Sequence, residues 1–421
     1  MCYSLAMNSN NMTESHTDMN KKKNILFLTP RFPYPLIGGD RIKSFYLLKY
    51  LSSYANVTLI TLSHGVSPQK EYVQVLENLG IQVHSITLFP FGAALRSLST
   101  FWTKFPLEIL FYLHPGFRKK VKDLIKNHHF DIAFAFFMRT AEYLKDVSIK
   151  KVLIAEDCRA LYQSRSAKAS TNIVQKLVRH WEVLKLQVYE PTITPYFDIT
   201  TLVTNDDIKE MQKYNADATY ALLSNGIDLS IMKSSSTDQL HMREGLVFIG
   251  KLDLWANSMM IQTIVKDILP NVIKVYPHIT FSIAGADPSP NIVALASDNI
   301  HIYPNVKSTE DFLYQAAIFV HPHKGASGIQ NKVLQAMACG CVVITTPTGI
   351  QGIPAIHNEH VFIANTNEEI SSFILFLLEN PDKRISMAKQ ARTLIENHFS
   401  WEAIYKQMDD VLLQCGISLH S

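Results

Sequence analysis

Cysteine is scarce in this chain of 421 residues, and no group of cysteines has the spacing of metal ligands. The five cysteines are Cys2, Cys158, Cys339, Cys341 and Cys415. An odd number at this low density does not form a disulfide framework and fits a reducing, cytosolic compartment. The sequence therefore predicts neither structural disulfides nor a metal site built on cysteine.

An excess of charge of one sign is also missing. The chain has 40 Lys and Arg against 37 Asp and Glu, so its net charge of +3 leaves no electrostatic footprint for nucleic acid. Hydrophobic residues make up 47% and charged residues 18%, which is typical of a soluble globular protein and excludes a disordered chain. The length suits two domains of about 200 residues each.

Long apolar runs are absent too. Residues 1–20 are polar, without the apolar stretch of a signal peptide, and residues 1–23 are predicted to be a disordered tail. No run reaches the ~18 apolar residues of a spanning helix. Residues 89–113 are aromatic-rich but interrupted by prolines and charges, and four basic residues follow within 118–122. They are either a surface that lies on a membrane or two core-packing helices with a solvated basic end.

Strand and helix signals alternate in two blocks around a polar linker. The apolar run Asn24–Thr29 is typical of a buried parallel strand, and residues 199–203 are predicted to be the last strand of the first block. A long helix is expected from about Asn172 to Glu190, ended by Pro191. The pattern predicts an α/β protein with two doubly wound, Rossmann-like domains facing across a cleft. The predicted parts are a tail (1–23), a first domain (24–233), a linker (234–240), a second domain (241–400) and a final helix (401–421) that returns to the first domain.

The segment from His321 to Pro347 carries the strongest chemical signal. Gly325 and Gly328 lie between a predicted strand and a predicted helix, where small residues let backbone N–H groups approach an anion. Lys332 follows in the first turn of that helix and is suited to meet a phosphate, and the amide of Gln335, one turn further, to bond a sugar hydroxyl. A glycine-rich loop with a solvated lysine is the alternative. His321 and His323 have the spacing of two metal ligands on one strand face, but no third ligand is evident.

This segment resembles the donor-site motif of family-4 glycosyltransferases, which have the GT-B fold. Those enzymes typically carry two glutamates with seven residues between them, the second in a sequence like LEAMA, which residues 333–338 (VLQAMA) match. Ser327 and Gln335 stand at the two glutamate positions, so both carboxylates are missing. The form GIQNKVL, residues 328–334, is closer to the sugar transferases associated with PEP-CTERM/exosortase polysaccharide loci, which have lost the first glutamate as well.

The resemblance extends over most of the chain. Five further segments match elements of that group in the right order, namely 29–45 (a proline-rich loop and then GDRIKSF), 246–251 (LVFIGK), 255–257 (WAN), 282–285 (SIAG) and 399–401 (FSW). The resemblance implies an acceptor-binding first domain and a nucleotide-sugar-binding second domain. It implies a metal-independent reaction that retains the anomeric configuration, with no cofactor besides the nucleotide-diphosphate-sugar donor.

The resemblance also assigns roles to single residues. Gly38 and Gly39 lie where the first-domain loop approaches the transferred sugar and diphosphate, and Gly250 and Lys251 where the donor strand ends and a basic residue contacts the phosphates. The second basic residue of the wider family falls near Asn257 and is missing here, so Lys332 is expected to supply that charge. The donor-binding set is thus Gly38, Gly39, Gly250, Asn257, Gly325, Ser327, Gly328 and Gln335, with Lys251 and Lys332 as catalytic residues.

Asp157 is the third candidate catalytic residue. It follows a predicted strand at the carboxyl edge where open sheets bind ligands, and it resembles an aspartate that many relatives carry there. It is suited to orient an acceptor hydroxyl or accept its proton. The alternative is that it caps the helix that follows.

The sequence as a whole indicates a retaining glycosyltransferase of exopolysaccharide or cell-envelope biosynthesis. Its expected partners are a nucleotide-sugar and a glycan or polyprenyl-linked acceptor, without nucleic acid. The expected location is the cytoplasm, with peripheral contact to the inner face of the plasma membrane as a further hypothesis. Two alternatives stay open: a non-catalytic nucleotide-sugar-binding or partner subunit, because both motif glutamates are replaced, and a nucleotide-sugar epimerase of the same fold.

Overall fold

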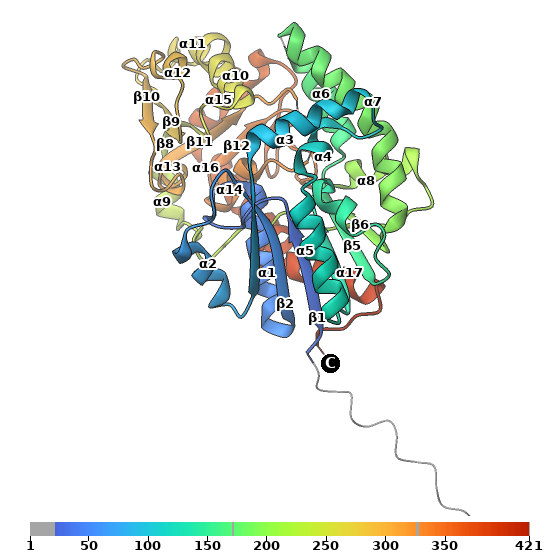
Figure 1. Ribbon diagram of the computed structural model, residues 1–421. Coiled ribbons are helices and arrows are strands. Elements are labelled where there is room, and N and C mark those ends of the chain that lie inside the picture. The colour runs from blue at the N-terminus through green and yellow to red at the C-terminus, as the bar shows by residue number, and fades with distance from the viewer. Residues whose placement is uncertain (1–21, 171, 326–327, 421) are drawn as a thin grey trace, which may run out of the picture.

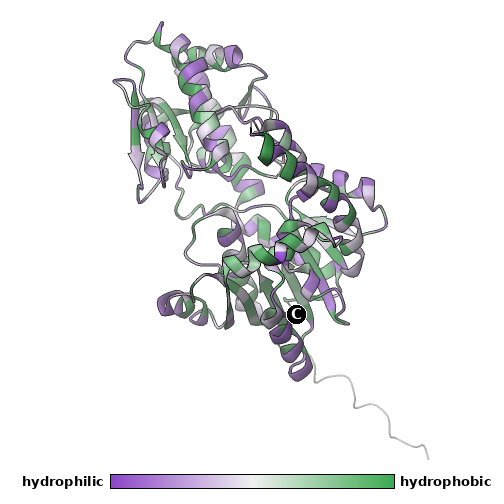
Figure 2. Ribbon diagram, turned by 45° about the horizontal axis from the view of Figure 1, so that its top comes forward, coloured by the Kyte–Doolittle hydropathy of each residue, from purple (hydrophilic) through white to green (hydrophobic). Residues whose placement is uncertain are grey.

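The computed structural model describes residues 22–170, 172–325 and 328–420. Its strands build two parallel sheets, each covered by helices on both faces (Figure 1). Figure 2 shows the hydrophobic residues concentrated in the strands and on the inner sides of the helices. Among the described residues no helix is both long and apolar enough to cross a membrane. The predicted fold class, two Rossmann-like units, is confirmed.

The first sheet has seven parallel strands in the order β3-β2-β1-β4-β5-β6-β7. Its central strands are buried on both faces: Ile25, Leu26 and Phe27 of β1 are each 0% exposed. A continuous apolar run is what a strand covered by two helical layers requires. The strands are β1 (Asn24–Thr29), β2 (Asn56–His64), β3 (Gln82–Leu88), β4 (Ile132–Phe136), β5 (Lys150–Glu156), β6 (Ile199–Leu202) and β7 (Tyr220–Leu222).

The helices of this part follow its strands along the chain. They are α1 (Gly39–Tyr54), α2 (Lys70–Glu77), α3 (Pro90–Ser97), α4 (Leu107–Tyr112), α5 (Pro115–Asn127), α6 (Arg159–Ala169), α7 (Ile173–Ile193) and α8 (Asn205–Tyr214), with short 3-10 turns η1 (Leu98–Phe101), η2 (Met138–Tyr143) and η3 (Thr194–Tyr196).

Two sequence predictions about this part are wrong. The helix α7 does not stop before Pro191 but includes it and ends at Ile193. A proline so near the end of a helix disturbs only the last turn. The strand β6 is not the last of this part, because β7 pairs with it in parallel as an additional edge strand.

The second sheet has six parallel strands in the order β10-β9-β8-β11-β12-β13. They are β8 (Glu244–Ile249), β9 (Phe281–Gly285), β10 (Ile300–Pro304), β11 (Ala316–His321), β12 (Val342–Thr345) and β13 (Phe362–Ile363). Its helices are α9 (Thr237–His241), α10 (Trp255–Thr263), α11 (Leu269–Ile273), α12 (Pro290–Val293), α13 (Glu310–Gln315), α14 (Asn331–Ala338), α15 (Asn367–Glu379) and α16 (Pro381–Phe399), with a π-helical turn η4 (Ile264–Ile268) between α10 and α11.

The final helix, α17 (Trp401–Gln414), packs against α1 of the first part rather than beside the second sheet. The Trp401 ring stacks on Tyr46 with centroids 4.4 Å apart, and Tyr405 stacks on Tyr50 at 4.3 Å. The Tyr50 hydroxyl donates to Asp409 Oδ1 at 2.6 Å. The chain therefore crosses between the two sheets twice, once before β8 and once between α16 and α17.

Candidate functional site

The carboxyl ends of the two sheets face each other, which brings loops of both parts into contact. A Cβ atom placed on Gly328, after β11, would lie 3.7 Å from Cβ of Asp157 and 3.5 Å from Cγ2 of Val203. The Asn225 amide donates to Asn331 Oδ1, at the first position of α14, over 2.8 Å. Ligands of open α/β sheets bind outside the carboxyl ends of the strands, so this junction is the candidate site.

The loop between β1 and α1 reaches the start of α14. A Cβ atom on Gly39 would lie 2.5 Å from Nδ2 of Asn331, so a side chain at this position would displace Asn331. Gly38 stands at the N-cap of α1 with φ of 96°, a conformation that favours glycine. The predicted pair Gly38 and Gly39 is thus placed against the helix that carries Lys332.

Lys332 lies in the first turn of α14, and neutral groups surround its amine. Its Nζ donates to Oδ1 of Asn257 and lies 5.1 Å from the centre of the Phe248 ring. Burial lowers the pKa of Lys332 to about 7 because the charged form loses its hydration. A cation at a helix N-terminus, whose partners among the described residues are an amide oxygen and an aromatic ring, is suited to receive an anion.

Asn257, in the first turn of α10, ties this lysine to the end of β8. Its side chain is buried, and its Nδ2 donates to the Lys251 carbonyl over 2.7 Å. A Cβ atom on Gly250 would lie 2.9 Å from Nδ2 of Asn257 and 3.5 Å from Nζ of Lys332, so only glycine leaves room for this contact. Three predicted donor-site residues, Gly250, Asn257 and Lys332, are therefore in one cluster.

Lys251 is in a different electrostatic setting from Lys332. Its ammonium lies 3.0 Å from Asp253 and 3.4 Å from Asp287, and its side chain is 48% exposed. Hydrogen bonds to the two carboxylates raise its pKa. The two lysines predicted to meet the diphosphate thus differ, since one is already paired with acids and the other is not.

His321 and His323, at the end of β11, form a stacked pair beside this cluster. Their ring centroids are 5.2 Å apart and the planes differ by 13°. Burial, with Lys332 contributing, lowers the pKa of His323 to about 4 and that of His321 well below its ordinary value, so both rings are neutral. Their Nε2 atoms are buried without a hydrogen-bond partner in the described part of the chain. Sequence reasoning weighed these histidines only as metal ligands and missed this neutral pair, although the HPH pattern at a strand end was the visible signal.

No group of three metal-ligating side chains gathers in the described ranges. Gln335 is partly exposed on α14, one turn beyond Lys332, and Gly325 lies in the loop between β11 and α14. Ser327, the other predicted donor-site residue of this loop, lies outside the described residues.

Asp157 does not cap the helix that follows it, so this alternative is wrong. The N-cap position of α6 belongs to Cys158, and the amides of Arg159 and Ala160 donate to the buried Glu190 carboxylate at 2.7 and 3.2 Å. Asp157 instead forms an ion pair with Arg159 at 3.3 Å. Its Cβ atom lies opposite Gly328, at the junction of the two parts.

Arg159 links Asp157 to the segment 89–113. Its guanidinium donates through Nε and Nη2 to the two oxygens of Glu108, on α4, at 3.0 Å each. Burial alone would raise the pKa of Glu108, but the positive charges of Arg159 and Arg139 outweigh this effect and hold the pKa below its usual range. This bidentate pair fixes the orientation of Arg159 and, through it, of Asp157.

Besides Lys332, the junction contains a fully buried lysine that sequence reasoning missed. Lys43 of α1 is 1% exposed, lies 2.6 Å from Glu156 at the end of β5, and donates to the Leu223 carbonyl at 2.6 Å. Glu156 has φ of 73°, which is rare for a residue with a side chain. Burial lowers the pKa of Lys43 and raises that of Glu156, and the opposite charges counteract both shifts.

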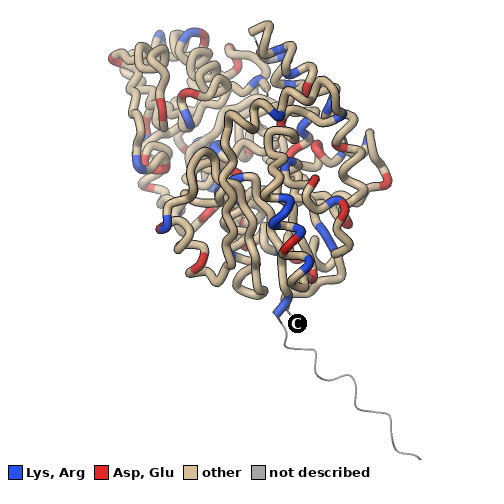
Figure 3. The backbone as a smooth tube through the Cα atoms, in the orientation of Figure 1, with Lys and Arg blue, Asp and Glu red and all other residues tan. Residues whose placement is uncertain are grey.

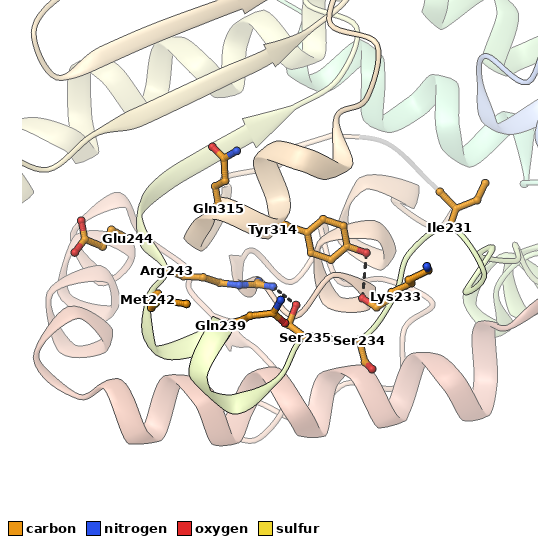
Figure 4. A pocket seen from close by; sticks show the side chains of 10 residues that line it. All are labelled: Ile231, Lys233, Ser234, Ser235, Gln239, Met242, Arg243, Glu244, Tyr314 and Gln315. Atoms are coloured by element: carbon orange, nitrogen blue, oxygen red, sulfur yellow. Dashed lines mark hydrogen bonds between the residues drawn. The ribbon is translucent and has the colours of Figure 1, made fainter.

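A cavity of about 630 Å³ lies elsewhere, near the first residue of β8 and the end of α13 (Figure 4). Residues 231–244 and α13 line it, and Tyr314 donates to the Lys233 carbonyl while Arg243 donates to Ser235. None of the residues predicted for the donor or acceptor lines this cavity, so we assign it no part in the candidate site.

Similar proteins were found by sequence and by structure. An uncharacterized 44.6 kDa protein in the cps region of Klebsiella pneumoniae is 21% identical over 91% of this chain and 98% of its own length. A crystal structure of Anabaena HepE in complex with UDP and glucose has a TM-score of 0.63 at 14% identity, covering 92% of this chain and 99% of that one. Sucrose-phosphate synthase from Thermosynechococcus elongatus has a TM-score of 0.69 at 15% identity, covering 93% and 99%.

The structural matches show the GT-B fold for the whole arrangement of two sheets. The family match is confined to the part that holds Gly250, Asn257, Lys332 and Gln335. Residues 243–380 match the family model described as glycosyl transferases group 1, so the similarity to that family lies in the second half of the chain.

Proposed function

We propose that the chain is a retaining glycosyltransferase that moves a hexosyl group from a nucleoside-diphosphate sugar to a glycan or lipid-linked acceptor. The observation that carries the proposal is the Lys332 amine, which lies at the N-terminus of α14 with neutral partners, directly after Asn331, the residue that contacts Gly39 and Asn225 of the first part. A diphosphate supplies the negative charge that this position lacks.

The residues of the cluster take separate roles in this reaction. The acceptor hydroxyl attacks the anomeric carbon, the new C–O bond forms, and the bond to the diphosphate oxygen breaks on the same face of the sugar. Lys332 and the α14 dipole stabilise the charge that develops on the leaving diphosphate, without the need for a metal ion. Asp157, held by Arg159 on the opposite side, orients the acceptor hydroxyl and accepts its proton. Lys251 meets the diphosphate from the end of β8.

The setting that fits this activity is exopolysaccharide or cell-envelope biosynthesis, on the cytoplasmic side of the membrane. The relative in a cps region supports polysaccharide assembly, and the bound UDP and glucose of Anabaena HepE support a nucleotide-sugar donor. The residues 328–334 favour the PEP-CTERM/exosortase-associated group of sugar transferases within the family. We also propose the division into an acceptor-binding part at 24–233 and a donor-binding part at 241–400.

The test is a thermal-shift titration with UDP, GDP, ADP and CMP. A ligand at 100 times its Kd adds about 2.7 kcal/mol of stability, which is easily measured. We expect one diphosphate to stabilise the protein and Lys332→Met to abolish that shift. The matched control is Lys274→Met, which replaces an exposed lysine of the second part whose amine donates to Asn271 on its own helix turn, and this variant should keep the shift. If no nucleotide stabilises the wild type, the proposal fails.

One alternative keeps a specific observation in its favour. Because Gln335 stands where the motif glutamate is expected, the chain can bind a nucleotide-sugar without turning it over. Stabilisation by a nucleotide together with no release of nucleoside diphosphate from the matching nucleotide-sugar, in the presence of membrane extract as a source of acceptors, would favour this non-catalytic role.

A further inference from the structure

Large apolar side chains are exposed along two segments of the first part of the molecule. Twelve such residues, each at least 49% exposed, lie in the segment that runs through α3 and η1 and on α7; they are Phe89, Phe91, Leu95, Leu98, Phe101, Trp102, Ile173, Val174, Leu177, Val178, Leu184 and Val188. We call this set the apolar ridge. Isolated exposed apolar residues are ordinary, whereas a contiguous group of this size indicates an interaction surface.

The two segments of the ridge are side by side. Trp181 of α7 donates to Thr100 Oγ1 at 3.4 Å, and its ring lies 5.6 Å from that of Phe101. Lys185 donates to the Thr103 carbonyl, and the Glu182 carboxylate accepts from the Leu107 amide at 2.9 Å. These contacts hold α7 against η1 and the loop that follows, so the exposed residues of both belong to one surface (Figure 1).

The exposed residues of α7 share one side of the helix. At about 100° per residue, the six apolar positions between Ile173 and Val188 fall within a sector of about 140°. The side chains that α7 buries against the protein, among them Leu186 and Glu190, lie outside this sector. The helix thus differs from an ordinary surface helix, whose outward side is polar, because apolar residues cover part of its outward side as well as its inward side.

The charge around the ridge has one sign. Residues 89–107 and 168–188 contain six lysines and arginines and a single acidic residue, Glu182. That carboxylate is buried and accepts backbone hydrogen bonds, so it does not offset the basic residues at the surface. Lys104, Lys168 and Lys176 are exposed. Figure 3 marks the basic positions along α6 and α7 at the upper right.

We propose that the apolar ridge lies in the headgroup region of an anionic membrane. Aromatic and aliphatic side chains with lysines at their margin are the combination that binds in the plane of an interface, where apolar burial and attraction to anionic lipids add. The sequence alone left open whether residues 89–113 meet a membrane or pack in the core. The structure divides this stretch. Ile109 and Leu110 of α4 are buried in the core, whereas the exposed apolar residues of 89–102 form the ridge together with those of α7.

The ridge adjoins the candidate site through α4. Glu108, at the start of α4, holds Arg159 and so positions Asp157, while the backbone N–H groups of α4 are held by Glu182 of α7. A membrane that contacts the ridge is therefore beside the proposed acceptor side of the junction. The membrane contact itself does not depend on the proposed reaction, and the two are tested separately.

The experiment is vesicle flotation of the full chain, with vesicles of phosphatidylcholine alone and of equal parts phosphatidylcholine and phosphatidylglycerol. We expect the protein to float only with the anionic vesicles and to detach as salt is raised. The double variant Leu95→Glu/Leu177→Glu should lower the bound fraction about tenfold or more, because it removes two apolar side chains from the interface and places two negative charges against anionic lipid. The matched control is Val275→Glu/Ile356→Glu, whose positions are 53% and 55% exposed in the second part, and it should bind as the wild type does.

Tryptophan fluorescence gives an independent readout, because Trp102 is 83% exposed and lies on the ridge. Anionic vesicles should shift its emission to the blue, and Trp102→Phe should remove most of that shift. No flotation with anionic vesicles, or equal loss in the control variant, would overturn the proposal. A concentration-dependent dimer that Leu95→Glu/Leu177→Glu dissociates, without any flotation, would show that a second copy covers the ridge. The nucleotide thermal shift of the same variant separates failure here from failure of the proposed function.

Discussion

Two lysines, Lys43 buried and Lys332 partly buried, lie where the two halves of the molecule meet, and they differ in what surrounds their charge. In the first half, Lys43 lies 2.6 Å from the Glu156 carboxylate and donates to a backbone carbonyl. In the second half, the Lys332 amine has the Asn257 amide oxygen and the Phe248 ring as partners. A buried lysine with its own carboxylate is satisfied within the fold, whereas one with neutral partners gains from an incoming anion.

The largest expected effect is on stability and concerns the first lysine. Lys43→Met leaves the Glu156 carboxylate buried and unpaired, so the free energy of unfolding should fall by about 3–5 kcal/mol. Urea denaturation measures this loss. Lys332→Met is the matched variant and should cost little, because it removes a charge whose burial is unfavourable.

Equal stability losses in the two variants would break the comparison. The double variant Lys43→Met/Glu156→Gln should regain part of the stability lost in Lys43→Met, since no isolated charge then remains. If Lys43→Met loses less than about 1 kcal/mol of stability, the Lys43–Glu156 pair contributes no more than an exposed ion pair does.

The next largest effect is the pH dependence of nucleotide-sugar affinity, which we expect to follow the protonation of Lys332. Because the pKa of Lys332 is lowered to about 7, half of the amines are already neutral at that pH. A bound diphosphate favours the protonated amine and raises this pKa, so affinity is full below pH 7 and falls by up to about tenfold per pH unit above it. Calorimetric titration with the intact nucleotide-sugar, whose diphosphate charge is constant in this range, should show proton uptake on binding.

The control for this pH dependence is Lys332→Arg, whose guanidinium stays charged. Its affinity profile should be flat between pH 6 and pH 9, the range in which the wild type declines. A wild-type profile that is flat as well would mean that Lys332 does not meet the diphosphate, and the contrast between the two lysines would lose its functional meaning.

The smallest effect is on Gln335, one turn beyond Lys332. Gln335→Glu should tighten nucleotide binding by about 1 kcal/mol, roughly fivefold, because a charged acceptor strengthens the hydrogen bond to a ribose hydroxyl. Weaker nucleotide binding by Gln335→Glu would indicate that the new carboxylate pairs with Lys332. Lys332 would then have a carboxylate partner, as Lys43 already has.

The sequence predicted those parts of the fold that depend on local pattern. The strand Asn24–Thr29 has the predicted bounds, because an apolar run between turn signals is typical of a buried strand. The strand Tyr220–Leu222 was not predicted, since three half-buried residues leave no pattern. Glycine and lysine positions of the candidate site were predicted from the family motif, and the structure places Gly250, Asn257 and Lys332 close together.

The missed parts of the site depend on contacts between distant residues. Asn257 and Lys332 are 75 positions apart, and nothing in either segment alone predicts that one holds the amine of the other. The same holds for Lys43 on α1 and Glu156 at the end of β5, which come into contact only in the folded molecule. The stacked histidines were visible as a pattern, but their neutral state follows from burial, which the sequence does not show.

The packing of α17 on α1 has a consequence for the order of events during synthesis. The hydrophobic core on that side of the first sheet includes Trp401, Ile404 and Met408 together with residues of β1 and α1. The ribosome delivers those three side chains only after the whole second sheet has been translated. We therefore expect the second half to complete its core before the first half has received its last helix. The first half is translated first but is the last to be completed.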